Sequence, residues 1–191
     1  MIISLSGSAG SGKSTVAEKL AKKLNFKRYY AGGIRRAEAK RRGLTLAEFN
    51  AWSETHKEGD TIVDDFWQKL AKQKPVPNVI AEGRTAFHFI PHSLKIYLQV
   101  PLGAAAKRIW AGWKKEAAKR NEDADVHSLK DLQESLGERE ASDARRYQKY
   151  YKLNIADPRH YDFYLDVSQM NQAEEFAAVY EFVKKALDEK P

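Results

Sequence analysis

Short apolar runs alternate with longer segments of helical periodicity along most of this chain. Five runs have the length of strands, and they cover residues 1–6, 27–30, 78–82, 94–100 and 162–167. The run at 1–6 is predominantly apolar, which is typical of a strand buried on both faces of a parallel sheet. The alternation predicts an α/β fold in which helices cover both faces of a five-stranded parallel sheet.

The helical segments complete this picture of one sheet and its covering layers. Apolar residues recur on one helical face in the segment 14–24 and again in 172–187, and a long helical pattern spans 128–151. The prolines within 74–78 end one helix and lead into the third strand. The length of 191 residues and the absence of an internal repeat predict a single domain.

A glycine-rich loop connects the first predicted strand to the first predicted helix. It reads Gly-Ser-Ala-Gly-Ser-Gly-Lys-Ser at 7–14, the pattern of a P-loop. Its backbone N–H groups and the N-terminus of the helix are expected to bind phosphate groups. Lys13 is expected to reach the β- and γ-phosphates, and the Ser14 hydroxyl is expected to bind Mg²⁺.

An acidic residue and several arginines extend this phosphate chemistry. The third strand ends at Glu82, where ligands bind in open α/β sheets, so we expect Glu82 to hold the hydration shell of Mg²⁺. Arg84 follows at the mouth of the sheet, and Arg108 lies eight residues beyond Val100, on the helix that leads to the charged segment at 114–129. Arg139 and Arg146 are seven residues apart and therefore share a helical face. Several arginines around one P-loop favour two phosphorylated substrates over one.

The segment 114–129 differs from the rest because it is highly charged and short of large apolar residues. Such a segment contributes little to a core. Two interpretations remain open at this point: a lid that closes over the substrate, with Lys119 and Arg120 as candidate cations, or a solvated surface helix.

Composition narrows the classes of function. The net charge is +7, and ten Lys and Arg with a single acid, Glu38, lie between residues 19 and 42. Nucleic-acid binding through this basic stretch and electrostatic steering of anionic small molecules are both compatible with it. The absence of Cys excludes disulfides and Cys-ligated metals. We find no basic leader and no apolar run that approaches about 18 residues, the length of a membrane span. We therefore expect a cytoplasmic protein without membrane contact.

The chain resembles the short cytidylate kinases of archaeal type, within the nucleoside monophosphate kinases. The resemblance covers nearly the whole chain through the segments GSAGSGKST, AGGIRR, GDTIVDD, AEGRTA, LKIYLQVPLGAAAKRI, EREASDARRYQKYY and YDFYLDVS, in that order. It implies a three-layer P-loop NTPase fold with a core at 1–30, 78–113 and 130–191, acceptor-binding helices at 31–74 and a mobile lid near 114–129.

The resemblance also implies site residues and cofactors. ATP, with Mg²⁺, would be bound by Gly7, Ser8, Ala9, Gly10, Ser11, Gly12, Lys13, Ser14 and Thr15. Arg36 and Arg84 would hold the phosphate of the acceptor. The transferring group would be clamped by Arg108, Arg139 and Arg146. The resemblance predicts a kinase whose partners are small nucleotides.

The acceptor site departs from the family pattern at one position. The chain has Ala-Gly-Gly at 31–33 where the family usually has Ala-Gly-Asp. The missing acid at Gly33 favours transfer to a phosphate monoester, which is already anionic at neutral pH, over transfer to an alcohol that needs a base. For the cytosine amino group we select Asp64 as acceptor, with Asp60 and Asp65 as alternatives.

Other residues carry weaker signals. Trp52 and Tyr30 could stack on a base, although core packing is the favoured interpretation for both. His88 and His92 have the spacing of a metal pair, but Pro91 interrupts any helix between them. Tyrosines and basic residues alternate at 145–151, a pattern compatible with RNA stacking, and the helical spacing again favours packing.

The leading hypothesis is therefore a kinase of CMP or dCMP. Two alternatives stay open: a kinase of AMP, UMP or a phosphorylated metabolite, and a non-enzymatic P-loop protein that contacts nucleic acid. Because a single domain can hold the complete site, we expect a monomer.

Overall fold

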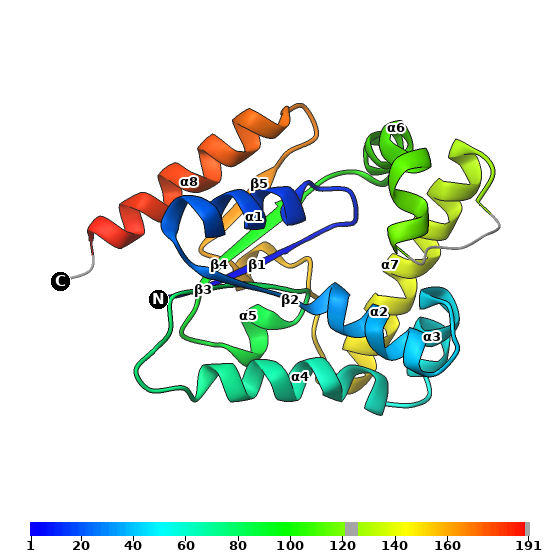
Figure 1. Cartoon of the computed structure of the whole chain (residues 1–191), viewed down its shortest axis with the longest axis horizontal. Helices are drawn as coiled ribbons and strands as arrows, with labels where there is room; N and C mark the ends of the chain where they lie inside the picture. The colour runs from blue at the N-terminus through cyan, green and yellow to red at the C-terminus, as the bar shows by residue number, and fades with distance from the viewer. Residues whose placement is uncertain (121–125, 190–191) are drawn as a thin grey trace.

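The computed structural model describes the backbone of residues 1–120 and 126–189, and the side chains of that part except for residues 113–120. One parallel sheet organises the chain, with strand order β2-β3-β1-β4-β5 (Figure 1). The strands are β1 (Ile2–Gly7), β2 (Lys27–Tyr30), β3 (Val79–Glu82), β4 (Leu94–Gln99) and β5 (Phe163–Asp166). The predicted α/β fold and its five parallel strands are confirmed.

Helices cover both faces of this sheet. One face packs against α1 (Lys13–Leu24) and α8 (Gln172–Asp188), and the other against α4 (Glu58–Ala71) and α5 (Ala86–Phe89). The remaining helices are α2 (Ala31–Arg41), α3 (Leu46–Ser53), α6 (Leu102–Arg120) and α7 (Leu129–Tyr151), with a short 3₁₀ turn, η1, at Pro158–His160. Figure 1 shows α2, α3, α6 and α7 grouped beyond the carboxyl ends of the strands.

The core explains why the first strand is apolar at successive positions. Ile3 and Leu5 face α1 and α8, whereas Ile2 faces α4, and all three are almost completely buried. Successive side chains of a strand point to opposite faces, so a strand covered on both sides has to be apolar on both. Trp67 of α4 is fully buried in the second cluster.

The strand register sets the position of the site. Leu5 of β1 pairs with Glu82 of β3, and Tyr30 of β2 pairs with Glu82 from the other side. The Ser6 hydroxyl donates a 2.8 Å hydrogen bond to the Gly83 carbonyl just beyond. The residues that follow β1, β2 and β3 therefore meet at one edge of the sheet.

The predicted lid coincides only in part with described residues. Residues 114–120 continue the backbone of α6 as helix, and α7 begins at Leu129 with Ser128 as its N-cap. Residues 121–125, and the side chains of Lys119 and Arg120, lie outside the described part of the structure. The lid remains a prediction.

Candidate active site

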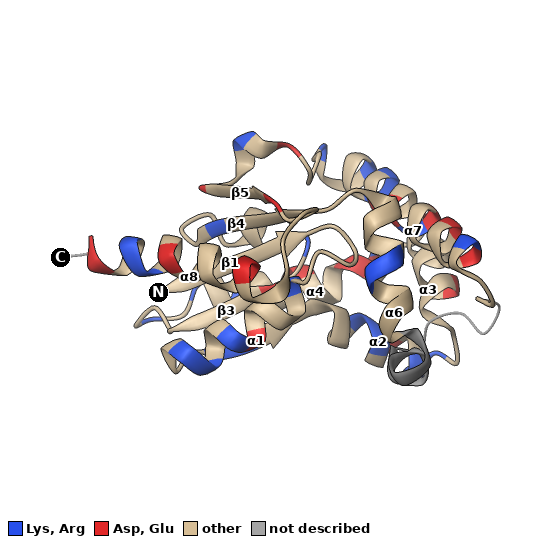
Figure 2. Ribbon diagram, turned by 90° about the horizontal axis from the view of Figure 1, so that it is seen from above, with Lys and Arg blue, Asp and Glu red and all other residues tan. Residues whose placement is uncertain are grey.

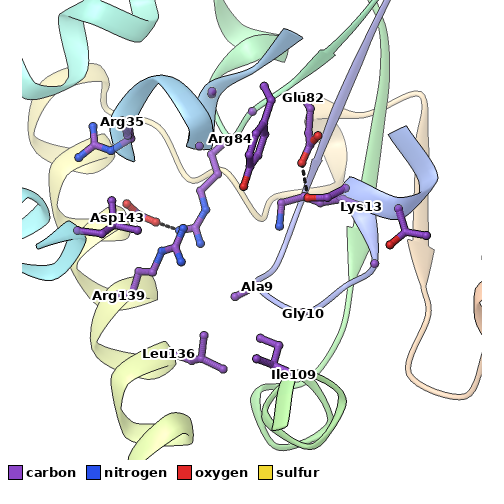
Figure 3. Close-up of a pocket in the computed structure, with 18 of the residues that line it drawn as sticks. Ala9, Gly10, Lys13, Arg35, Glu82, Arg84, Ile109, Leu136, Arg139 and Asp143 are labelled. Carbon is purple, nitrogen blue, oxygen red and sulfur yellow. Dashed lines mark hydrogen bonds and ion pairs between the residues drawn. The ribbon is translucent and has the colours of Figure 1, made fainter. Parts of the chain in front are cut away.

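A cavity of about 910 Å³ opens at the carboxyl edge of the sheet. One wall is the P-loop, the opposite wall comes from α2, α3 and α4, and α6, α7 and the start of α8 complete the lining. Figure 3 shows Lys13 and Glu82 on one side of the cavity and Arg35 and Asp143 on the other, with Arg84 between them. The cavity can therefore hold two ligands end to end.

The start of α1, just after the P-loop glycines, presents backbone N–H groups suited to an anion. Gly12 precedes the first helical residue with φ 77° and has no side-chain cap, so the first N–H groups of α1 lack an intrahelical partner. Gly10 has φ 69°, and a Cβ there would lie 2.9 Å from the Ala105 carbonyl oxygen. Only glycine fits both positions without strain. This geometry suits the phosphate binding predicted at the start of α1.

Lys13 lies in a strongly cationic environment. Its Nζ donates a 2.8 Å hydrogen bond to the Ser8 carbonyl oxygen. Desolvation, together with the neighbouring charges of Arg84 and Arg139, lowers the pKa of Lys13 to about 7. An anion bound among these three cations would be strongly attracted and would favour the charged form of Lys13.

Ser14 and Glu82 provide oxygen ligands suited to Mg²⁺. The Ser14 hydroxyl donates a 2.6 Å hydrogen bond to Glu82 Oε1, and the Glu82 side chain is fully buried at the end of β3. Mg²⁺ in phosphate sites uses one or two such oxygens and keeps several waters. The two residues therefore fit the predicted ion.

Arg28 was not recognised from the sequence as a site residue. Its Nε and Nη2 donate hydrogen bonds of 2.9 Å and 2.6 Å to Glu82 Oε2. The pairing arises because β2 and β3 are adjacent, and the two residues are 54 positions apart in the chain. Arg28 holds the buried carboxylate of Glu82 in place and compensates its charge.

Two of the predicted arginines point into the middle of the cavity with their guanidinium groups side by side (Figure 3). Arg84 and Arg139 both line it, and Arg84 forms an ion pair with Asp143 of α7 (Figure 3). Arg36 lines the acceptor end, where its Nη1 donates a 2.7 Å hydrogen bond to the Tyr30 hydroxyl. The expected contacts of these arginines to phosphate groups stay predictions.

Arg108 and Arg146 both bind protein groups in this structure, and only Arg108 lines the cavity. Arg108 lines the cavity, but its guanidinium binds Glu175 Oε1 at 2.7 Å and the carbonyl oxygens of Val167 and Met170. Arg108 therefore joins α6 to the loop between β5 and α8. Arg146 is fully buried and lies behind the cavity wall.

Of the three acids considered for the acceptor base, Asp64 has the most suitable position. It lines the cavity with 4% of its surface exposed, and the Tyr151 hydroxyl donates a hydrogen bond to its Oδ2. Burial raises the pKa of Asp64 to about 7. Asp60 instead binds arginines through both oxygens, and Asp65 is exposed.

Arg35, the neighbour of Arg36, also lines the cavity. Its guanidinium donates to Asp60 Oδ1 at 2.6 Å and to the Gly59 carbonyl at 2.8 Å. It also donates to Asn50 Oδ1 at 2.9 Å. Its only sequence signal was membership of the basic stretch. Arg35 joins α2, α3 and α4 into one wall.

The basic stretch at 19–42 divides into separate pairings. Arg28 and Arg35 bind the carboxylates just described, and Arg41 and Arg42 both bind Glu38. Lys19 and Lys23 lie over aromatic rings of α8. Figure 2 shows basic residues distributed over α1, α2, α6 and α7, with acidic residues among them. Much of the charge excess therefore has a local structural partner.

The aromatic candidates have different positions. Tyr30 lines the cavity. Trp52 stacks on His56 at 4.4 Å between ring centroids and lies under the Arg42 guanidinium, outside the cavity. Within 145–151, the Tyr150 hydroxyl binds the carbonyl oxygens of Ser53, the last residue of α3, and of Glu54 just after it, so this run holds α7 against its neighbours.

The histidine pair is separated by the end of a helix. His88 lies within α5 beside Tyr151, whereas His92 follows Pro91 in an exposed turn. In the described part of the chain, His, Asp and Glu side chains form no group of three or more that could hold a metal ion. Across the same residues, every helix is too short or too polar to span a bilayer.

Comparisons with known proteins agree with this geometry. The profile of the cytidylate kinase-like family matches residues 2–169. A cytidylate kinase from Methanocella arvoryzae is 35% identical over 189 residues, covering 99% of this chain and 98% of the relative. One from Pyrococcus abyssi is 36% identical, covering 98% and 94%.

Solved structures share the fold at low sequence identity. A shikimate kinase from Bacteroides thetaiotaomicron superposes with a TM-score of 0.62 and 13% identity over 98% of each chain. An uncharacterized protein from Eubacterium ventriosum gives 0.66 and 16%, covering 96% of this chain and 98% of the other.

Proposed function

The chain belongs to the cytidylate kinase-like family, and we propose that it transfers the γ-phosphoryl group of ATP to CMP or dCMP. The products are ADP and the pyrimidine nucleoside diphosphate. The observation that carries this proposal is that Arg84 lies in the same cavity as the P-loop and Arg36, between the two walls that bear them. This arrangement suits a reaction between two anionic substrates.

The chemistry requires positioning and charge compensation. The phosphate of a nucleoside monophosphate has a second pKa of about 6, so its attacking oxygen is already mostly anionic at neutral pH. Lys13, Arg84 and Arg139 lie where the transferring group would pass and compensate the charge that accumulates there. Bound Mg²⁺, held through Ser14 and Glu82, would supply further charge compensation on the phosphates of ATP.

The carboxylates near the reaction centre are poorly suited to act on an alcohol. Asp143 is paired with Arg84, and Asp60 is paired with Arg35 and Arg146. A carboxylate bound to arginine is a weak base because the cation stabilises its charged form. This supports a phosphate monoester as acceptor rather than a metabolite hydroxyl.

Asp64 provides a means of recognising cytosine. Tyr151 occupies Oδ2, which leaves Oδ1 to accept a hydrogen bond from the exocyclic amino group of the base. Uracil presents a carbonyl oxygen at that position, and an unpaired acceptor facing a carboxylate is unfavourable. We therefore expect CMP to be preferred over UMP.

A panel of monophosphates tests the proposal. ADP release from ATP and Mg²⁺ is measured with CMP, dCMP, UMP, AMP and GMP, and the highest kcat/KM is expected with CMP or dCMP. A preparation of Lys13→Ala controls for contaminating kinases. Turnover that no pyrimidine monophosphate stimulates would refute the proposal, and salt-sensitive RNA retention in its place would favour the nucleic-acid alternative.

A further inference from the structure

Five charged side chains of alternating sign connect the two walls of the cavity. The chain of ion pairs runs through Arg35, Asp60, Arg146, Asp143 and Arg84. Arg35 Nη1 lies 2.6 Å from Asp60 Oδ1, and Arg146 Nε lies 3.0 Å from Asp60 Oδ2. Arg146 Nη2 binds Asp143 Oδ1, and Asp143 Oδ2 pairs with Arg84. Each aspartate thus bridges two arginines.

The central member differs from the other four. Arg35, Asp60, Asp143 and Arg84 all line the cavity, whereas Arg146 is fully buried behind them. A substrate in the cavity can meet the outer members directly, but it can meet Arg146 only through Asp60 and Asp143.

We propose that Arg146 is a positioning residue that sets Arg84 and Arg35 for the reaction by holding Asp143 and Asp60. The inference rests on the proposed function, because phosphoryl transfer to CMP is its readout. It assigns Arg146 a role other than contact with the transferring group.

The geometry requires a guanidinium at this position. Arg146 uses three nitrogens on three partners: Nε on Asp60, Nη1 on Ser142 Oγ at 2.9 Å, and Nη2 on Asp143. A lysine ammonium has the same charge but is a compact group without this planar fork. It cannot hold two carboxylates on opposite sides at the same separation.

Positioning matters here because the site concentrates like charges. Arg84 lies close enough to Lys13 to lower its pKa, and so does Arg139. In the absence of a substrate, the Asp143 carboxylate is the group that draws Arg84 toward α7. If Arg146 is displaced, the Asp143 carboxylate changes its orientation. The guanidinium of Arg84 is then no longer held between the two substrate positions.

Arg146→Lys tests the proposal, with Arg145→Lys as its matched control. Arg145 is the next residue of α7, is exposed and binds Glu54, outside the cavity. We expect Arg146→Lys to lower kcat with CMP about 100-fold, to raise the KM for CMP, and to leave the KM for ATP nearly unchanged. Arg145→Lys is expected to stay within about twofold of the wild type.

A merely structural role gives a different result. It would lower the melting temperature and the active fraction but leave both KM values of the folded protein unchanged. A double-mutant cycle adds a second criterion: because Asp143→Asn breaks the same link, its combination with Arg146→Lys should cost little more than either change alone.

If Arg146→Lys fails to fold, Asp60→Asn takes its place in the test. It retains the side-chain volume and removes the ion pairs that Asp60 makes with Arg35 and Arg146. Wild-type kinetic constants in a folded Arg146→Lys or Asp60→Asn variant, or additive losses in the cycle, would overturn the inference. A wild-type protein that does not use CMP would refute the proposed function instead.

Discussion

The hydroxyl of Tyr151, the last residue of α7, donates a hydrogen bond to the buried carboxyl group of Asp64 on α4. The two residues are 87 positions apart in the chain. The contact fixes one oxygen of Asp64 and directs the carboxyl group at the acceptor end of the cavity. It therefore joins the packing of α7 to the proposed recognition of the base.

Tyr151→Phe should weaken discrimination between CMP and UMP. Without the hydroxyl, Asp64 loses its fixed orientation and the pKa of its carboxyl group rises further, because a hydrogen bond to the charged form is removed. The ratio of kcat/KM for CMP to that for UMP should fall about tenfold, the value of one hydrogen bond to a charged group. Tyr150→Phe is the control, since Tyr150 binds the backbone carbonyl oxygens of Ser53 and Glu54. An unchanged ratio in Tyr151→Phe would exclude Asp64 as the group that reads the base.

Asp64→Asn should change the pH dependence of stability. Burial raises the pKa of Asp64 from 3.8 to about 7, so the folded state retains this proton while the unfolded state has lost it. The free energy of unfolding of the wild type therefore falls, on account of Asp64, as pH rises from about 4 to about 7, by an amount of the order of a few kcal/mol.

Urea unfolding of both proteins at pH 4.5 and pH 8 measures this effect. The asparagine variant has no proton to lose, so its stability relative to the wild type should increase with pH. A difference that is the same at both pH values would show that Asp64 titrates normally.

The elements and the P-loop could be predicted because their signals are local. Strand β1 is apolar at successive positions, and the glycines of the P-loop lie just before Lys13. Glu82 ends a strand that begins just after the prolines of 74–78. Each of these features depends on neighbours in the sequence. The carboxyl ends of the parallel strands lie at one edge of the sheet, so the P-loop and Glu82 meet there without any further contact being needed.

The remaining site residues depend on contacts between distant segments. Arg145 and Arg146 are adjacent and chemically identical, yet one is exposed and the other fully buried, because α4 supplies Asp60 on one side of α7 only. Helical spacing places Arg139 and Arg146 on the same face but cannot show that α4 covers part of it. Arg28 and Arg35 likewise acquire their roles from carboxylates on other elements.

Lys13→Ala should abolish activity without destabilising the fold. The ammonium group lies beside Arg84 and Arg139, which lower its pKa, so its removal relieves repulsion in the protein without nucleotide. We expect turnover to fall at least about 100-fold, as for the loss of one electrostatic contact in a transition state. The melting temperature should stay the same or rise. Substantial turnover in this variant would contradict the assignment of the P-loop as the ATP site.

Arg28→Ala should affect both stability and the requirement for Mg²⁺. Glu82 is fully buried, and Arg28, whose side chain is 24% exposed, is the cation that binds its Oε2. Loss of one partner leaves a buried charge without compensation, and for a partly exposed partner we expect a loss of about 1 to 3 kcal/mol in the free energy of unfolding. Glu82 should also lose its orientation toward Ser14, so the Mg²⁺ concentration at half-maximal activity should rise. Lys27→Ala is the matched control, because Lys27 is the preceding residue of β2, is exposed and has its ammonium group over the Tyr29 ring. A Mg²⁺ dependence equal to that of the Lys27 variant would show that Arg28 stabilises the sheet edge and plays no part in placing the metal ligands.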